Sequence, residues 1–71
     1  MEIIANYEIP EPGWTVVVLK WAIGVWQVAA NNSGKLYTLP PGDLDTEEAA
    51  HALAQRYAEM YRQAWPEPES N

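Results

Sequence analysis

The hydrophobic pattern changes period once, at the proline- and glycine-rich segment 40–43, and this change points to an α+β fold. Before it, residues 14–20, 25–30 and 35–39 are rich in the β-branched and aromatic side chains that strands favour. After it, apolar residues recur with helical spacing over about 46–65, where Pro66 stops the helix. The sequence therefore predicts an α+β domain in which one long C-terminal helix packs on one face of a three-stranded antiparallel sheet.

The segment that precedes the predicted sheet has two interpretations. Residues 2–8 form either a short strand or an arm laid across a neighbouring molecule, and the prolines and glycine of 9–13 separate them from the first predicted strand. We expect residues 1–13 to form an N-terminal arm or extra strand, residues 14–65 a single β-β-β-α domain, and residues 66–71 a disordered tail.

The stretch KWAIGVW (20–26) raises the question of where its two tryptophans point. A hairpin with Ile23 and Gly24 at its tip places Trp21 opposite Trp26. One face of this hairpin is then entirely apolar, so we expect it to face the helix. The residues of that face are Val17, Leu19, Trp21, Trp26, Val28 and Ala30.

Apolar surface beyond the needs of a small core predicts an interface. The apolar arc of the helix spans about half the helical wheel, wider than the usual stripe of about 100°. The second face of the sheet keeps Trp14, Val16 and Val18. The chain has 71 residues and no cysteine, so disulfides and thiolate metal sites are excluded. We therefore expect a homodimer, a protein partner or both.

The acidic residues Asp43, Asp45, Glu47 and Glu48 gather where the helix begins. Asp45 is expected to cap the helix, with Glu48 closing a capping box. A calcium loop needs a different spacing, so capping explains these acids without a metal. His51 is expected to be a lone surface histidine on the solvent side of the helix, although Glu48 before it and Gln55 after it leave a metal or proton-transfer site open.

No catalytic constellation is present in the sequence. Ser33 and Thr38 have no base in their sequence context, and NNSGK (31–35) lacks the glycine spacing of a phosphate-binding loop. The sequence therefore predicts a non-enzymatic protein without a cofactor. The N-terminus lacks the pattern of a signal peptide, and the longest apolar stretch is shorter than a membrane span, so a cytoplasmic location is expected.

The net charge of −6, from four basic and ten acidic residues, favours a basic protein surface as the partner. Nucleic-acid affinity depends on Lys and Arg, which are scarce here. The alternative function is nevertheless nucleic-acid binding through the side of the sheet that carries Lys20 and Lys35.

The aromatic residues are four tryptophans and four tyrosines, with no phenylalanine. Tyr and Trp combine an apolar ring with a polar group and are enriched at binding hot spots. A protein-binding site is therefore predicted from aromatic residues near the ends of elements together with the acids at the helix start. Its residues are Trp14, Trp65, Tyr7, Tyr61, Asp43, Asp45, Glu47 and Glu48.

Three short motifs resemble two families of small domains. They are WTV (14–16) at the start of the sheet, GKLY (34–37) at its second turn and DTEEA (45–49) at the helix start. Over residues 14–61 this order is similar to the AP2-like N-terminal domain of some integrases, whose sheet enters the DNA major groove. It also resembles HicB-like antitoxins, acidic domains that neutralise a small basic RNA-cleaving toxin. With the charge, the second resemblance implies a non-catalytic inhibitor, antitoxin or regulator that occupies the surface of another protein.

Overall fold

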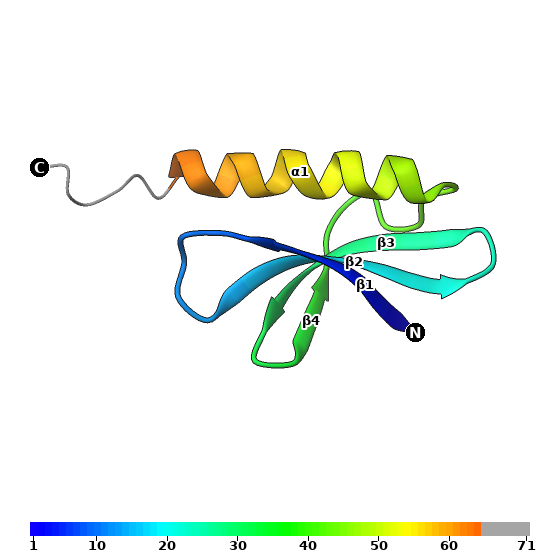
Figure 1. Cartoon of the computed structure of the whole chain (residues 1–71), viewed down its shortest axis with the longest axis horizontal. Coiled ribbons are helices and arrows are strands. Elements are labelled where there is room, and N and C mark those ends of the chain that lie inside the picture. Colours follow the sequence, from blue (N-terminus) through cyan, green and yellow to red (C-terminus); the bar gives the residue numbers. More distant parts are fainter. Residues whose placement is uncertain (65–71) are drawn as a thin grey trace, which may run out of the picture.

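A four-stranded antiparallel sheet carries a single helix in the computed structural model, which describes residues 1–64 (Figure 1). The elements are β1 (Glu2–Glu8), β2 (Trp14–Ala22), β3 (Val25–Asn32), β4 (Lys35–Thr38) and α1 (Glu47–Ala64), and the strands are neighbours in sequence order. The predicted α+β class with a C-terminal helix is confirmed, with four strands in place of three. Trp65 and the expected tail of residues 66–71 lie outside the described residues.

The additional strand is formed by residues 2–8, for which the sequence predicts either a short strand or an arm. β1 pairs with β2 of the same chain, with Ile3 opposite Leu19 and Tyr7 opposite Val16. The register shifts between Ile3 and Ala5, so β1 contains an irregularity near its start. β1 is thus an edge strand of this chain's own sheet.

The register of the β2–β3 hairpin differs from the predicted one. The turn does lie at Ile23 and Gly24, but Lys20, not Trp21, lies opposite Trp26. The register shifts between Lys20 and Ala22, which makes Trp21 the extra residue of a β-bulge. Because side chains alternate between the two faces of a strand, one extra residue moves the part of β2 before the bulge, residues 14–20, to the other face. Trp21 is 49% exposed, so its predicted place in the core is wrong.

The core on the helix side therefore contains the residues of β3 that were predicted to face the helix. From β2 it contains the residues that were predicted to face away from it. Val16, Val18 and Val28 are fully buried there, and Trp26 packs against them. Val16 and Val18 are therefore not surplus apolar surface, contrary to expectation. From α1 the buried residues are Ala50, Ala54 and Ala58, spaced four apart on one side of the helix. Small side chains along this stripe allow the helix backbone to come close to the sheet.

A second apolar cluster lies on the opposite face of the sheet. Val17, Leu19 and Ala29 are at most 1% exposed, and Leu36 of β4 packs against them. Val17 and Leu19 alternate with the helix-facing valines of β2, so the central strands are buried on both faces. Each fully buried Val or Leu contributes about 1.5–3 kcal/mol, so both faces matter for a domain of this size.

Two local features place β4 and α1 beside the central strands. Ser33 and Gly34 both have positive φ, 54° and 92°, which is the signature of a type I′ turn between β3 and β4. After β4 the chain returns to β3, where Leu44 exchanges two backbone hydrogen bonds with Trp26. This bridge sets the position from which α1 begins.

The helix cap is Thr46, and the prediction that Asp45 caps it is wrong. Thr46 Oγ1 accepts a hydrogen bond from the backbone N–H of Ala49 at 3.1 Å. The residue three positions after the cap is therefore Ala49, which has no carboxylate to close a capping box. Within residues 1–64 no helix combines the length and the apolar character needed to cross a membrane.

Candidate partner-binding site

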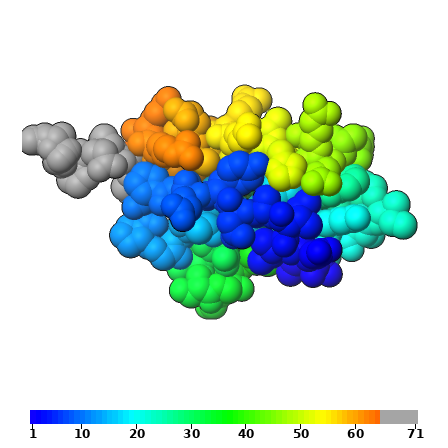
Figure 2. All heavy atoms as spheres, viewed as in Figure 1, coloured from blue at the N-terminus to red at the C-terminus, as the bar shows by residue number. Residues whose placement is uncertain are grey.

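The helix leaves part of its own side of the sheet uncovered. Within the described residues α1 contacts β1, β2 and β3 but not β4. In the space-filling view the β4 hairpin projects from the side of the molecule away from the helix (Figure 2). The surface between the end of α1 and β4 is where side chains of the sheet remain accessible.

An aromatic pair occupies this uncovered surface. Trp14 at the start of β2 and Tyr37 on β4 lie opposite Asn32 and Ala30 of β3, so both point to the helix side. Their ring centroids are 5.8 Å apart and the planes are inclined by 34°. Trp14 is half-buried and Tyr37 is 49% exposed. The pair thus presents an aromatic surface to solvent.

Beside this pair lies an open hollow of about 270 Å³. It collects residues from four parts of the chain: the β1–β2 connection, the start of β2, the end of β3 and the last turns of α1. Two of its residues, Trp14 and Tyr61, were predicted to bind a partner, and the fold brings them together. The lining residues are Ile9, Glu11, Trp14, Ala30 and Tyr61.

Neighbouring contacts fix the helix wall of the hollow. The ring of Tyr61 stacks on that of Tyr57, with the ring centroids 6.4 Å apart. The Tyr57 hydroxyl donates a hydrogen bond of 2.7 Å to the carbonyl of Pro40. The Arg62 guanidinium lies 3.2 Å from a carboxylate oxygen of Glu59. It also donates a long hydrogen bond of 3.5 Å to the backbone carbonyl of Glu8. These contacts tie the last turns of α1 to the segment after β4 and to the end of β1.

Among the described residues, Glu11 is the single charged one that lines the hollow. Its backbone carbonyl accepts a hydrogen bond from the N–H of Trp14, which closes the turn into β2. The side chain is half-buried, and within residues 1–64 it forms no ion pair. The hollow therefore combines an apolar lining with one negative charge.

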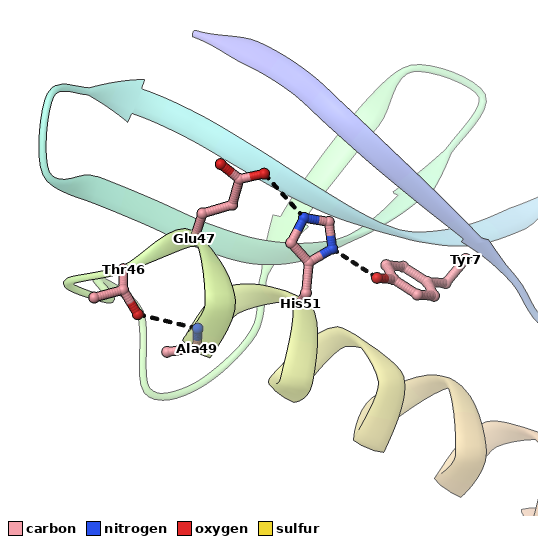
Figure 3. Close-up of polar contacts among 5 residues, drawn as sticks. All are labelled: Tyr7, Thr46, Glu47, Ala49 and His51. Carbon is pink, nitrogen blue, oxygen red and sulfur yellow. Dashed lines mark hydrogen bonds and ion pairs between the residues drawn. The ribbon is translucent and has the colours of Figure 1, made fainter.

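At the other end of α1, His51 has two side-chain partners (Figure 3). Its Nδ1 lies 2.7 Å from the Tyr7 hydroxyl and its Nε2 lies 3.2 Å from a carboxylate oxygen of Glu47. The prediction of a lone surface histidine is wrong, and neither Glu48 nor Gln55 is its partner. Tyr7, predicted to bind a partner, is used within the chain to hold β1 against α1.

The acids predicted to share the binding site are distant from the hollow. Tyr61 lies fourteen positions after Glu47 in the helix, which corresponds to about 20 Å along the axis. Asp43 accepts a hydrogen bond from Gln27, while Asp45 and Glu48 are exposed. The predicted site thus divides into an aromatic part at one end of α1 and an acidic part at the other. Trp65 lies outside the described residues.

The two lysines of the alternative function also lie apart. Lys20 is opposite Trp26 near the β2–β3 turn, with its Nζ 6.0 Å from the Trp26 ring centroid. Lys35 is opposite Asn32, which pairs with Trp14 at the other end of β2. Six residues of strand, about 20 Å, therefore separate the two positions. They form no continuous basic surface.

Among residues 1–64, no three histidine, aspartate or glutamate side chains gather to form a metal site. Of the hollow's lining, the sequence prediction missed Ile9, Glu11 and Ala30, and it also missed Tyr37 beside it. The position of Tyr37 is predictable, because a two-residue turn at Ser33 and Gly34 places it diagonally from Trp14 across β3. Ile9 and Glu11 depend on the path of the β1–β2 connection, for which the sequence carries no signal.

Comparisons of the chain with protein-family models, curated proteins and solved structures find no match.

Proposed function

We propose that this protein is a non-catalytic protein-binding module that occupies a partner's surface with the uncovered aromatic end of its sheet. The observation that carries the proposal is the hollow lined by Trp14 and Tyr61 beside the exposed ring of Tyr37. Large aromatic side chains next to a recess are the usual energetic centre of protein interfaces. These residues are held by their neighbours, which lowers the entropy cost of binding.

Binding is also the chemistry that the lining supports. The described residues of this lining are two aliphatic residues, two aromatic residues and one with a carboxylate. Among residues 1–64 the lining includes no histidine, serine or threonine, so this part of the chain does not supply the paired nucleophile and base of covalent catalysis. The net charge of −6 favours a basic partner, because opposite charges steer association.

An inhibitor, antitoxin or regulator is the kind of module that we propose, acting in the cytoplasm. The resemblance to HicB-like antitoxins supports this class. In such a protein the binding surface itself performs the function, since covering the partner's working surface is sufficient.

Site-specific photocrosslinking tests the proposal. A photoreactive phenylalanine derivative replaces Tyr37 in one variant and Ile23 in a control variant. Ile23 is 95% exposed and apolar, but it lies at the β2–β3 turn. After irradiation in a lysate of the source cells, we expect one protein to be crosslinked at position 37 and not at position 23. Mass spectrometry of the crosslinked peptide then identifies the partner.

A specificity control uses Tyr61→Ala in the background of the crosslinker at position 37. We expect the crosslink to decrease, because Tyr61 forms one wall of the hollow. Crosslinks that form equally at positions 37 and 23, or whose yield is unchanged in Tyr61→Ala, would contradict the proposed surface.

A further inference from the structure

We propose that the hollow binds the side chain of an arginine from the partner protein, with Glu11 as its counterion. This inference rests on the proposed function, because it names the chemistry of the partner at the same site. It is carried by the combination, in one recess, of two aromatic rings with a carboxylate that has no ion-pair partner among the described residues.

The first argument is charge. Within residues 1–64, Glu11 is the single charged residue of the lining and has no ion-pair partner. All four lysines and arginines of the chain lie within residues 1–64, and none of them forms an ion pair with Glu11. A cation for Glu11 must therefore come from outside the described part of the chain. The net charge of −6 makes such a cation favourable at long range as well.

The second argument is the cost of the alternative occupants. An apolar side chain in the hollow would remove water from the Glu11 carboxylate without replacing its hydrogen bonds, which is unfavourable. A carboxylate on the partner would add repulsion between like charges. A cation compensates the loss of water by a charge-assisted hydrogen bond.

The third argument is the shape of the recess. Its volume of about 270 Å³ is below the roughly 300–1,000 Å³ of pockets for whole small-molecule ligands, so a single side chain fits better. The rings of Trp14 and Tyr61 are suited to a planar cation, and guanidinium groups stack on aromatic faces more readily than ammonium groups. Ile9 and Ala30 provide apolar contacts for the aliphatic stem of the arginine.

Two small probes separate charge from shape. Nα-acetyl-arginine amide carries the guanidinium, and Nα-acetyl-citrulline amide has nearly the same shape without the charge. Each is titrated into the ¹⁵N-labelled full chain to tens of millimolar while NMR follows the indole N–H of Trp14. We expect the arginine probe to shift this resonance and to bind about tenfold more tightly than citrulline, the factor for one charge-assisted hydrogen bond.

Matched variants assign the selectivity to one carboxylate. Glu11→Gln should bring the affinity for the arginine probe down to that for citrulline. Glu48→Gln makes the same change on the exposed first turn of α1, and it should keep the difference. Unchanged amide shifts outside the hollow show that Glu11→Gln is folded.

The outcomes also separate this inference from the proposed function. Equal binding of the two probes, or no shift of the Trp14 indole with the arginine probe, would overturn the arginine assignment. Loss of selectivity in Glu48→Gln would overturn it as well, because the effect would then come from overall charge. Crosslinking at position 37 does not depend on these results, so it still decides whether the surface binds a protein.

Discussion

The Tyr7 hydroxyl lies 2.7 Å from Nδ1 of His51, and this contact joins two residues that are 44 positions apart in the chain. The two rings also meet edge to face, with centroids 6.1 Å apart. On its other side His51 reaches Glu47, so both of its ring nitrogens have partners. An edge strand is held by backbone hydrogen bonds on one side only, and Tyr7 adds a side-chain connection between β1 and the helix.

Tyr7→Phe removes the hydroxyl and leaves the ring. We expect it to lower the free energy of unfolding by about 1 kcal/mol, the net value of a hydrogen bond. For a domain of this size that corresponds to a decrease in Tm of about 4–8 °C, measured by circular dichroism. The control is Tyr37→Phe, because the Tyr37 hydroxyl has no hydrogen bond within the described residues. An equal decrease in both variants would contradict the role of the Tyr7–His51 contact.

Thr46→Ala tests the position of the helix cap. Loss of the hydroxyl that accepts from the Ala49 N–H should cost about 0.5–2 kcal/mol. Thr46→Ser keeps that acceptor and should remain close to the wild type. Asp45→Ala should cost less than Thr46→Ala, since it removes only a charge near the helix N-terminus. Urea denaturation measures all three, and the reverse order for Thr46→Ala and Asp45→Ala would place the cap at Asp45.

Leu19→Ala tests whether the sheet face away from the helix is a true core. Leu19 is 1% exposed and packs with Val17 and Ala29. Truncation of a fully buried leucine typically costs about 2–5 kcal/mol, and we expect a loss in that range. Ile23→Ala at the 95% exposed turn should stay within about 0.5 kcal/mol of the wild type. A small effect of Leu19→Ala in urea denaturation would mean that this face is solvated.

The helix and the strands after residue 13 could be predicted because their signals are local. Pro40, Pro41 and Gly42 interrupt the strand pattern, and the acids before Ala49 mark a helix start. The bulge at Trp21 has no comparable signal. The predicted register made one face of the hairpin wholly apolar, yet the observed register buries both faces of β2. When both faces are buried, hydrophobic alternation no longer determines the register.

The candidate site, like the fold, was predicted only in the part that has local sequence signals. Trp14 and Tyr61 were identified as aromatic residues, Trp14 at the start of a strand and Tyr61 on the broad apolar arc of the helix. Glu11 was treated only as part of a charge count, because its position depends on how the β1–β2 connection passes the end of α1. Exposed acids at the helix start were grouped with the aromatics, but helix length alone separates them by about 20 Å.

Nucleic-acid binding is tested with labelled single- and double-stranded DNA and RNA by fluorescence anisotropy. We expect no binding at physiological salt, because Lys20 and Lys35 lie at opposite ends of β2 and the net charge is −6. Binding that falls steeply with salt and is lost in Lys20→Glu and Lys35→Glu would contradict this expectation. It would favour the integrase-like alternative.

Self-association is predicted through one flank of α1. Leu53, Arg56, Tyr57 and Met60 have the i, i+3, i+4, i+7 spacing of a helix stripe and line a shallow second hollow, and Met60 is 58% exposed. We expect a dimer in size-exclusion chromatography with light scattering, unchanged at high salt because apolar contacts are not screened. Met60→Glu should give a monomer, since dimerisation would bury an unpaired charge. Gln55→Glu introduces the same charge at an exposed position outside this stripe and should remain dimeric. A wild-type monomer at all concentrations would leave the aromatic end of the sheet as the one surface proposed for association.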